Sequence, residues 1–549
     1  MSASDRRSAN YFPNIWTDEY LQSLSSAYGE EMYLQRVEKL KLEVRNFLTE
    51  KTNGSLIDQI ELVDILQRLG ISHHFRDYQE KILQNVQAAL ISNGQDWNKE
   101  DNLHATALAF RLLRQDGHAI STDIFRNFMD EITGSFKASL CSDLTGLLSL
   151  YEASYLSMEG ESLMYAAQVF ATRHLREKLK EDKMDQDIAK EITHALEAPL
   201  RWSMPRLESR WFIDVYEKRQ DMNPLLLELA KLDFNILQKM YQDELMQLSS
   251  WFSKSKLAKR LSFARDRVVE CFSAAVGFTY EPYFSYSRMT ITKFIVLLNI
   301  IDDIYDVYGT LVELELFTEV IKRWDINCLE QLPDYMKISF LALFNTVNEM
   351  TYDVLRDQEF NINSYAAETW AEVCEKYLVE ARWYNSGYKP TLNEYLSNGG
   401  VSVACHLFVL LAYMCTTNPV EEKTLKDLQR HPEFIKSASL VSRLADDLAT
   451  SSDELKRGDI PKSIQCYMHD TGCSEEDARS YIRNLMHSTW KSINKNVIMD
   501  HEYPKEIISI AENFARFTQW FYECGDGHRN PIEFKEQMFA LFFEPIPLP

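Results

Sequence analysis

Apolar residues recur every three or four positions along most of this chain, and this spacing constrains the fold more than any other feature. The pattern is clear in KLKLEVRNFL (39–48), LIDQIELVDILQRLG (56–70), LHATALAFRLLRQDG (103–117) and LTGLLSLYEASYL (144–156). Such spacing places apolar side chains on one face of an α-helix. Only 17 Gly and 15 Pro occur among the 549 residues, so few positions interrupt long helices. We therefore expect an all-α protein.

The length of the chain indicates more than one domain, because single hydrophobic cores rarely grow beyond roughly 250–300 residues. A bundle of helices with short loops is expected up to about residue 230, and NPLLLELAKLDFNIL, from Asn223, opens a series of longer helices. We place the boundary near residues 215–230 and predict two α-helical domains, 1–220 and 221–549. The polar first residues, with Pro13, are expected to be extended.

Three aspartates follow directly on an apolar run in FIVLLNIIDDIYDVYG, from Phe294 to Gly309. Burying an unpaired carboxylate is costly, so such groups are normally paired, protonated or bound to metal. On a helix, Asp302 and Asp306 share a face, while Asp303 lies about 100° away around the axis. Carboxylates in this arrangement suit Mg²⁺, which commonly bridges protein carboxylates and substrate phosphates. The alternative is a solvated helix end, which the preceding apolar run disfavours.

A second acidic cluster occurs in LVSRLADDLATSSDELKRGD, where Asp446, Thr450 and Glu454 are spaced four and four residues apart. This spacing makes one polar ridge beside an apolar helix face, although a solvated face has the same pattern. Two such ridges on separate helices suggest a cleft that binds several Mg²⁺ ions. Several divalent ions in one cleft imply a highly anionic ligand, and a diphosphate fits.

Basic residues flank both clusters. Arg265 and Arg267 precede the first cluster, Arg443 lies one turn before Asp446, and Lys462 follows the second cluster. Arginine is suited to binding phosphate oxygens through several hydrogen bonds. Any one of these residues alone would read as a surface salt-bridge partner, so their position beside the clusters is what favours a diphosphate site.

Other classes of function are disfavoured. The formal net charge is −23, whereas a general nucleic-acid surface needs a basic stripe. No apolar run approaches the roughly 20 residues of a membrane span. P-loop, GxGxxG, GxSxG and HExxH motifs are absent, and the SHH at 72–74 reads as a loop rather than a ligand pair. We expect no nucleic-acid partner and no membrane span.

The nine cysteines are scattered without CxxC or zinc spacing, which is typical of reduced thiols inside the cell. The N-terminal MSASDRRSANYFPNIW has no apolar signal-peptide core, and the residues before Arg6 are too few for an ordinary transit peptide. We expect a cytoplasmic protein, or a plastid protein if a targeting segment has been removed.

Taken together, the motifs resemble a plant terpene synthase of class I over essentially the whole chain. Arg6, Arg7 and Trp16 match that family's RRx8W element, and RDR at 265–267 matches its RxR element. DDIYD matches its aspartate-rich motif, and DDLATSSDE matches its second metal motif, (N/D)Dxx(S/T)xxxE. The ending FYECGDG…FFEPIPLP is similar to the angiosperm subfamily that contains monoterpene, isoprene and some farnesene synthases.

The resemblance implies a C-terminal class I catalytic bundle and an N-terminal α-barrel-like domain that is a relic of another cyclase type. A class II DxDD motif is absent from the sequence. The segment with Arg6, Arg7 and Trp16 is expected to cap the closed active site. About three Mg²⁺ ions are expected, with Mn²⁺ as the alternative, on Asp302, Asp303, Asp306, Asp446, Thr450 and Glu454. The family is often monomeric, so we expect a monomer.

The implied reaction is ionisation of an acyclic prenyl diphosphate, followed by proton loss or water capture. The residues expected to take part are Arg265, Asp302, Asp303, Arg443, Tyr522 and Asp526. Substrate contacts are expected from Arg265, Arg267, Asp302, Arg443, Asp446, Lys462, Ala274 and Ile295. An enzyme that extends prenyl chains is disfavoured because it would normally carry a second DDxxD motif. An inactive helical scaffold is disfavoured because every metal-motif position is intact.

Two positions bear on substrate length. Ala274 stands where many family members have a tryptophan, which enlarges the pocket unless another aromatic such as Phe272 or Phe278 fills the space. Ile295 stands where isoprene synthases of the subfamily have a phenylalanine, so isoprene is not expected. We favour farnesyl diphosphate and an acyclic sesquiterpene such as farnesene. The alternative is a monoterpene synthase that converts geranyl diphosphate to ocimene, linalool or a cyclic product.

Overall fold

The computed structural model describes residues 6–7, 9, 11–52, 54–91, 102–181, 184–499, 502–523 and 530–548. Within these ranges the regular secondary structure is helical, and one isolated β-bridge pairs Met129 with Phe136. The expected all-α fold is therefore confirmed. Short 3₁₀ helices connect some α-helices, at Ala27–Gly29, Ser72–His74, Thr122–Phe128, Ala138–Ser142, Pro282–Phe284, Ile326–Gln331 and Pro531–Phe534.

Contacts divide the chain into two compact units, which are described separately here. The larger unit comprises Met1–Ser25, Met240–Trp490 and Glu502–Phe543, and the smaller one comprises Ser26–Lys239, Lys491–His501 and Glu544–Pro549. The boundary predicted after residue 220 lies between α9 and α10, and it stays a prediction because the contacts divide the chain within α10.

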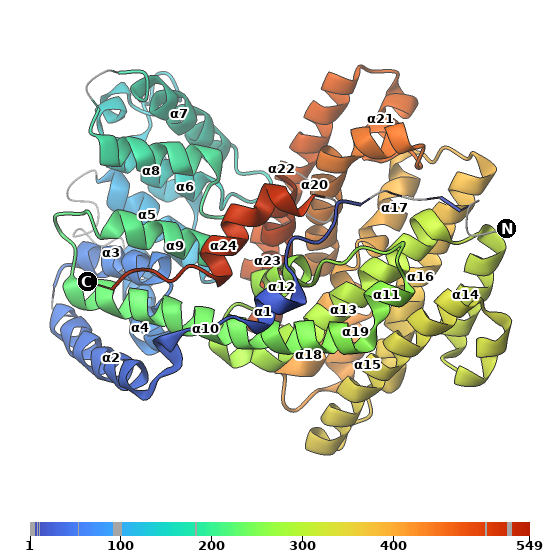
Figure 1. Ribbon diagram of the computed structural model, residues 1–549. Coiled ribbons are helices and arrows are strands. Elements are labelled where there is room, and N and C mark those ends of the chain that lie inside the picture. The colour runs from blue at the N-terminus through green and yellow to red at the C-terminus, as the bar shows by residue number, and fades with distance from the viewer. Residues whose placement is uncertain are drawn as a thin grey trace. The chain divides into compact units, whose positions relative to one another are not determined.

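The smaller unit is built around one cluster of buried apolar side chains, among them Leu66, Phe110 and Phe125. Gly70 and Gly117 follow α3 and α5 with φ of 75° and 89°, a left-handed conformation that favours glycine, so these helices end where the sequence indicated. Its helices are α2 (Glu31–Lys51), α3 (Leu56–Arg68), α4 (Arg76–Ile91), α5 (Leu103–Gln115), α6 (Leu144–Ser154), α7 (Ser162–Lys178), α8 (Gln186–Glu197), α9 (Pro205–Tyr216) and the first part of α10 (Pro224–Ser255) (Figure 1).

The larger unit contains the remaining helices (Figure 1). They are α1 (Asp18–Gln22), the end of α10, α11 (Leu257–Arg260), α12 (Val268–Phe278), α13 (Ser285–Asp303), α14 (Leu311–Arg323), α15 (Asp334–Gln358), α16 (Asn363–Ser386), α17 (Leu392–Ser402), α18 (Cys405–Thr416), α19 (Glu422–Leu428), α20 (Glu433–Arg457), α21 (Ser463–Thr471), most of α22 (Glu475–Met499), α23 (Lys505–Glu523) and α24 (Lys535–Phe542).

Helices α13 and α20, which carry the two acidic motifs, are packed on several sides. Helix α13 contacts α12, α15 and α18, and α20 contacts α17, α18 and α23. In α13 every residue from Phe294 to Ile301 is buried, so the apolar run before the aspartates lies in the core. Each acidic motif is therefore held on a rigid element, which is the arrangement that a precise site requires.

One described stretch, Leu392–Thr416, is long and apolar enough to cross a membrane by length and composition, with a mean hydropathy of 1.7. This stretch departs from the expectation that no apolar run reaches such a length. It comprises two helices, α17 and α18, which meet at Ala404 with φ of 61°, and 72% of its most apolar window is buried inside the protein. Burial of this kind is typical of core helices.

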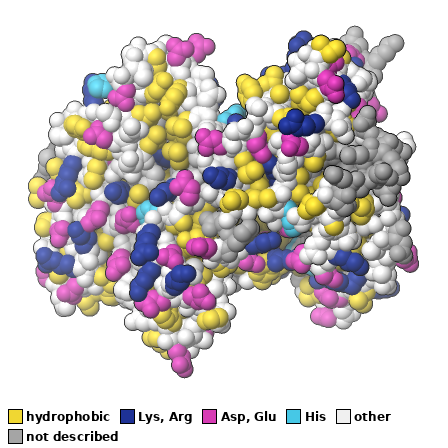
Figure 2. Space-filling view, turned by 180° about the vertical axis from the view of Figure 1, so that it is seen from behind, with side chains coloured by type: hydrophobic (Ala, Val, Ile, Leu, Met, Phe, Trp, Pro, Cys, Tyr) yellow, Lys and Arg dark blue, Asp and Glu magenta, His cyan; other side chains and the backbone are white. Residues whose placement is uncertain are grey.

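Charges of both signs are mixed on the face of the molecule shown in Figure 2. There the described Lys and Arg side chains lie among Asp and Glu side chains, with apolar side chains between them. Such mixing is typical of an ordinary solvated surface.

Candidate active site

The first carboxylate cluster lies where α13 ends. Helix α13 ends at Asp303 and is followed by a π-helical turn over Ile304–Tyr308, so Asp306 lies in the π turn rather than in the continuous α-helix that the spacing predicted. Single π-helical turns frequently occur at functional sites. Asp302 and Asp306 line one cavity, whereas the side chain of Asp303 is fully buried beside it.

Arg265 connects the two adjacent aspartates of this cluster. Its guanidinium forms an ion pair with Asp302, and its Nε lies 3.0 Å from Oδ1 of Asp303. The backbone N–H of Arg265 donates to Oδ2 of Asp303 at 2.8 Å, and the hydroxyl of Tyr11 donates to Oδ1 at 2.5 Å. Both oxygens of Asp303 are thus engaged by protein groups, and its role as a metal ligand stays a prediction.

The second cluster follows one face of α20. Nη1 of Arg443 donates to Oδ2 of Asp446 at 2.7 Å, and the Thr450 hydroxyl donates to the Asp446 carbonyl at 3.0 Å. Nζ of Lys462 lies 3.5 Å from Oε2 of Glu454. These cations and oxygens come from α20 and the residue that precedes α21, so the second cluster is assembled within a short part of the chain.

One cavity brings both clusters together. Its polar part is lined by Arg265, Asp302, Asp306, Glu380, Arg443, Asp446, Thr450, Glu454 and Lys462. Most of the other lining side chains are apolar or aromatic, namely Ala274, Phe278, Ile295, Leu298, Tyr377, Val403, Phe408, Phe514, Phe517 and Tyr522. Polar and apolar regions of this kind in one cavity can hold a ligand that has a charged head and a hydrocarbon tail.

Three carboxylates of the site, Asp303, Asp306 and Asp446, have raised pKa values. Burial raises the pKa of Asp446 to about 7, although the Arg443 guanidinium opposes this shift. Burial and the neighbouring Asp302 hold the pKa of Asp306 well above its usual range. Burial also raises the pKa of Asp303, against the opposing effect of Arg265. Cations at this site would therefore favour the charged forms of these groups.

The cavity residues fit a hard divalent cation. Five carboxylates line the cavity beside three basic side chains, which leaves an excess of negative charge. Asp302 and Asp306 on one side and Asp446, Thr450 and Glu454 on the other offer oxygen ligands, which Mg²⁺ prefers. The arrangement can hold metal ions and an anionic group at one end of the cavity.

The residues expected to set the length of the pocket do lie at its apolar part. Ala274 and Ile295 both line the cavity. Phe278 lines it as well, and its ring lies 4.6 Å from that of Phe514 and 5.7 Å from that of Phe517. Phe272 instead packs between Tyr241 and Phe542. Phe278 therefore lines the same cavity as Ala274, whereas Phe272 does not.

Arg267, Tyr522 and Asp526 were also predicted to belong to the site. Arg267 is buried but does not line the cavity, and its Nη2 donates to the Phe12 carbonyl at 2.5 Å. Its predicted contact with substrate stays a prediction, since the structure shows it holding the N-terminal segment. Tyr522 lines the cavity. Asp526 lies outside the described residues.

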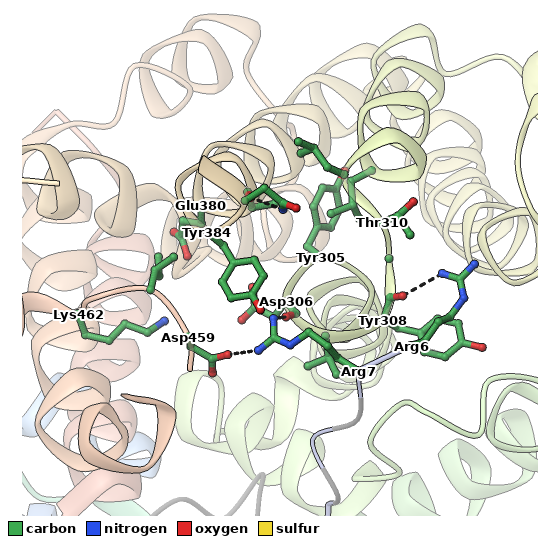
Figure 3. Close-up of a pocket in the computed structure, with 17 residues that line it drawn as sticks. Arg6, Arg7, Tyr305, Asp306, Tyr308, Thr310, Glu380, Tyr384, Asp459 and Lys462 are labelled. Atoms are coloured by element: carbon green, nitrogen blue, oxygen red, sulfur yellow. Dashed lines mark hydrogen bonds and ion pairs between the residues drawn. The ribbon is translucent and has the colours of Figure 1, made fainter. Parts of the chain in front are cut away.

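The N-terminal segment lies across a second pocket that adjoins the first (Figure 3). Arg6 pairs with Glu313 at 2.7 Å and donates to the Tyr308 carbonyl at 2.9 Å. Arg7 pairs with Asp459 at 2.5 Å and donates to the Asp306 carbonyl at 3.0 Å. The two pockets share Asp306, Glu380 and Lys462 in their linings, so the paired arginines lie at the edge of the catalytic cavity.

Trp16 anchors the other end of this segment. It is buried, and its ring lies 5.0 Å from that of Phe543 and 6.0 Å from that of Tyr20. These ring contacts are distinct from the ion pairs of the arginines. The segment is fixed by ion pairs at one end and by aromatic packing at the other.

Sequence reasoning missed several side chains of the site. Tyr11 completes the hydrogen bonds of Asp303, Asp459 pairs with Arg7, and Glu380 lines both pockets. Tyr11 lies between two residues of the recognised N-terminal motif, which is a signal that could have found it. Glu380 had no such signal, because an acidic residue in a long helix reads as a solvated face.

Comparisons with known proteins cover both parts of the chain. A family model described as "Terpene synthase, N-terminal domain" matches residues 15–196, and one described as "Terpene synthase family, metal binding domain" matches residues 253–492. The chain is 58% identical to a (+)-epi-alpha-bisabolol synthase of Phyla dulcis, with 100% of each chain covered. It is 50% identical to a (-)-alpha-terpineol synthase of Vitis vinifera, with 99% of this chain and 91% of that protein covered.

Solved structures of other proteins match this chain over nearly its whole length. A limonene synthase with 2-fluorolinalyl diphosphate matches with a TM-score of 0.94 at 40% identity, covering 99% of this chain and 100% of that one. Isoprene synthase from grey poplar leaves, in complex with three Mg²⁺ ions and dimethylallyl-S-thiolodiphosphate, matches with a TM-score of 0.89 at 40% identity, covering 98% and 100%. With both of its parts matched and a full-length relative at 58% identity, this chain belongs to the terpene synthase family.

Proposed function

We propose that this terpene synthase ionises farnesyl diphosphate with the help of Mg²⁺ and releases diphosphate and a fifteen-carbon terpene. The observation that carries the proposal is the single cavity lined by both carboxylate clusters, three basic side chains and a set of aromatic rings. A diphosphate matches the polar part of such a cavity, and a prenyl chain matches the apolar part.

About three Mg²⁺ ions would be held by Asp302 and Asp306 on one side and by Asp446, Thr450 and Glu454 on the other. The grey poplar isoprene synthase in complex with three Mg²⁺ ions supports this number. Oxygen ligands also suit Mn²⁺, which is the alternative metal. Bound Mg²⁺ would neutralise the negative charge that develops on the departing diphosphate. Asp303 would act through Arg265, because both of its oxygens already have partners in the protein.

Arg265, Arg443 and Lys462 lie at the polar part of the cavity, where they can bind phosphate oxygens. As the allylic C–O bond breaks, the diphosphate leaves with the electron pair and a carbocation remains on the prenyl chain. Positive groups that are already positioned around the leaving group stabilise its charge in the transition state without reorganising.

The apolar part of the cavity would protect the carbocation. Phe278, Phe408, Phe514 and Phe517 line it, and aromatic faces attract cations. The N-terminal segment, held by the Arg6 and Arg7 ion pairs, would exclude water from the edge of the cavity. Loss of a proton from a carbon next to the cationic centre gives a hydrocarbon, and capture of water followed by proton loss gives an alcohol.

The choice of farnesyl diphosphate has two supports. Ala274 leaves room at the apolar part of the cavity, and several relatives carry the names of fifteen-carbon products, including the (+)-epi-alpha-bisabolol synthase and an alpha-zingiberene synthase of Ocimum basilicum. The sequence favours an acyclic product such as farnesene, whereas those two names are those of ring-containing terpenes. Both outcomes start from the same ionisation.

A monoterpene synthase that uses geranyl diphosphate is the second candidate. The similarity to the Vitis vinifera (-)-alpha-terpineol synthase and to limonene synthase favours it. Such an enzyme would keep the same carboxylate clusters and would fill the space beside Ala274 with aromatic rings such as Phe278.

The deciding experiment is a Mg²⁺ assay of the purified protein with farnesyl and geranyl diphosphate in parallel, with products read by gas chromatography–mass spectrometry. A much higher kcat/KM for farnesyl diphosphate is expected, and a preference for geranyl diphosphate would establish the second candidate instead. A parallel assay adds isopentenyl diphosphate to test for chain extension. A terpene synthase should form no prenyl diphosphate that is longer than its substrate, and formation of one would indicate a chain-extending enzyme instead.

Ala274→Trp tests the volume argument, with Ala274→Ser as a control of nearly unchanged size. The indole should lower kcat/KM for the fifteen-carbon substrate by roughly tenfold more than for the ten-carbon one, since overpacking costs about 1–3 kcal/mol. Equal losses for the two substrates would show that Ala274 does not set the length of the pocket.

A further inference from the structure

A cluster of two histidines and a glutamate lies in the larger unit, apart from the residues that line the two pockets described above. Glu372 is on α16, His406 is on α18, and His431 lies between α19 and α20. Oε2 of Glu372 lies 3.2 Å from Nε2 of His431 and 3.7 Å from Nε2 of His406. The three potential ligand atoms all lie within 4.8 Å of one another.

His406 is the unusual member of the cluster. It is only 3% exposed, and neither ring nitrogen has a hydrogen-bond partner within the described part of the chain. Burial and the neighbouring His431 lower the pKa of His406 to about 3, although Glu372 opposes the shift. Neutral imidazole is the form that binds metal ions. A buried ring whose nitrogens have no hydrogen-bond partner among the described residues calls for another ligand.

The distances in the cluster match those around a tetrahedral metal ion. Zinc binds His nitrogen at about 2.0–2.1 Å and carboxylate oxygen at about 2.0–2.2 Å, which puts neighbouring ligand atoms of a tetrahedron about 3.3–3.5 Å apart. The two separations from the Glu372 oxygen, 3.2 and 3.7 Å, lie on either side of that range. An ion could therefore bind with only small movements of the three side chains.

The backbone at His431 supports a specific role for this residue. Its φ is 52°, in the left-handed region that residues other than glycine rarely occupy. Such conformations persist where the surroundings require them, and they gather at functional sites. The His431 ring lies 4.4 Å from that of His406, and its Nε2 is hydrogen-bonded to Oε2 of Glu372 at 3.2 Å.

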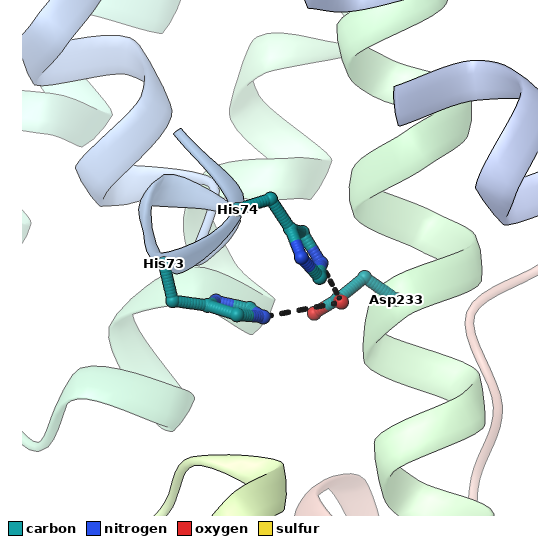
Figure 4. A group of neighbouring side chains, drawn as sticks. All are labelled: His73, His74 and Asp233. Atoms are coloured by element: carbon teal, nitrogen blue, oxygen red, sulfur yellow. Dashed lines mark hydrogen bonds and ion pairs between the residues drawn. The ribbon is translucent and has the colours of Figure 1, made fainter. Parts of the chain in front are cut away.

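A second histidine cluster provides the contrast. His73, His74 and Asp233 also approach one another in the smaller unit (Figure 4). There, however, Nε2 of His74 lies 2.7 Å from Oδ1 of Asp233, which is a direct hydrogen bond, and Nη1 of Arg206 lies 3.9 Å from the same carboxylate. Glu372 likewise has a hydrogen bond, to His431, and a cationic neighbour, Lys376. The clusters differ in that both ring nitrogens of His406 lack a hydrogen-bond partner among the described residues, whereas in His73 only Nε2 does.

We propose that Glu372, His406 and His431 bind one divalent transition-metal ion of the zinc type, with water as the fourth ligand. Two imidazole nitrogens favour such an ion over Mg²⁺, which prefers oxygen. Lys376 lies one turn after Glu372 on α16, and its positive charge acts on Glu372 and His406. This charge would weaken metal binding without preventing it.

The metal would join α16 and α18 to the start of α20, because His431 lies two residues before Glu433, where α20 begins. Helix α20 carries Asp446, Thr450 and Glu454. The site would therefore be structural, holding the helix of the second carboxylate cluster in place while the catalytic cavity binds its own ions.

The test uses the full-length protein stripped of metal and then saturated with Mg²⁺, so that the catalytic carboxylates are occupied. Titration with Co²⁺ should give one bound ion per chain with the strong visible absorption of tetrahedral cobalt. One equivalent of Zn²⁺ should remove this absorption and raise the Tm. Cobalt that replaces Mg²⁺ on oxygen ligands would be six-coordinate and absorb weakly, so the two sites are distinguished by their spectra.

The variants His431→Gln and Glu372→Gln should weaken Co²⁺ binding by roughly 100-fold or more, since losing only a hydrogen-bonding partner of a ligand already costs about 10–100-fold. They are preferred to changes at the buried His406, which could unfold the protein. His74→Gln in the other cluster is the matched control and should bind Co²⁺ as the wild type does. Unchanged binding in His431→Gln and Glu372→Gln, or the absence of a tetrahedral spectrum in the wild type, would overturn the proposal.

Discussion

The two carboxylate clusters of the cavity have the same pattern of contacts but obtain them from different parts of the chain. In each cluster the first aspartate pairs with an arginine, Asp302 with Arg265 and Asp446 with Arg443. In each, the second aspartate is buried and accepts hydrogen bonds from a tyrosine hydroxyl and a backbone N–H. These donors are Tyr11 and Arg265 for Asp303, and Tyr395 and Ser463 for Asp447.

The difference lies in the tyrosines. Tyr395 is on α17, a helix that packs against α20 and α21, and its side chain is buried. Tyr11 comes from the N-terminal segment, 292 residues away from Asp303 in sequence. The second cluster is therefore complete within its own group of helices, whereas the first is complete only when the N-terminal segment is docked. This difference suggests that docking of the segment completes the catalytic site.

The clusters also differ in backbone structure. The first spans the end of α13 and a π-helical turn, whereas the second lies within one continuous helix, α20. A π turn changes the direction of the side chains that follow it. The spacing of four residues in each motif therefore corresponds to two different local geometries that face the same cavity.

The largest expected effect is shared by the two clusters. Asp302→Ala and Asp446→Ala should each lower kcat/KM by about 10²–10³-fold or more, since both remove an oxygen proposed to hold metal at the leaving group. The measurement is steady-state turnover with saturating Mg²⁺, and Asp357→Ala on the exposed end of α15 is the matched control. Near-normal turnover of either variant would remove that residue from the proposed metal site.

The effect on stability should differ between substitutions of Tyr395 and Tyr11. Tyr395→Phe should lower the free energy of unfolding by about 1.5–3 kcal/mol, because the buried Asp447 loses a hydrogen bond to a charged group. Denaturant unfolding measures this, with Tyr388→Phe as control because the Tyr388 hydroxyl bonds the exposed Glu394. A variant as stable as the wild type would mean that the second cluster does not depend on its tyrosine.

Tyr11→Phe should behave in the opposite way. Loss of the Tyr11 hydroxyl should lower turnover by about tenfold, equivalent to about 1.4 kcal/mol. The Tm should change little, since the ring is kept and only the bond to Asp303 is removed. Tyr20→Phe, in the same segment and packed on Trp16, is the control. If Tyr11→Phe lowered stability as much as Tyr395→Phe, the contrast between the clusters would be lost.

The smallest effect is expected from the two arginines. Replacing Arg6 and Arg7 by Ala should lower the rate a few-fold and shift products toward alcohols, because the edge of the cavity becomes more accessible to water. Partly exposed ion pairs contribute about 0–1 kcal/mol each, so unfolding should change little. Product profiles and Tm are measured together. An unchanged profile and rate would mean that the segment does not cap the site.

The helices and the spacing of the acidic motifs could be predicted because both depend on residues close in sequence. The apolar run ending at Asp302 is buried as expected, and Asp446, Thr450 and Glu454 line one cavity from one helix. The π turn at Ile304–Tyr308 could not be predicted, since π-helical turns are rare and the four-residue spacing of Asp302 and Asp306 is also that of an α-helix.

Contacts between segments that are distant in sequence could not be predicted either. Arg267 was expected to contact substrate from its position before the first acidic cluster; this stays a prediction, and the bond from its Nη2 to the Phe12 carbonyl was not foreseen. Phe272 and Phe278 were equal candidates to fill the space beside Ala274, and only Phe278 lines the cavity. In both cases the residue type was informative, but the direction of the side chain depended on which helix it packed against.

By itself, the sequence determined that this chain is helical, that it carries two oxygen-rich clusters with cations beside them, and that it resembles terpene synthases, because these properties depend on local spacing and residue chemistry. The tertiary structure alone decided that Tyr11 completes the first cluster, that Glu380 faces both pockets, and that Glu372, His406 and His431 meet. Helical periodicity orients side chains over one or two turns, whereas contacts between distant helices depend on the packing of the whole unit.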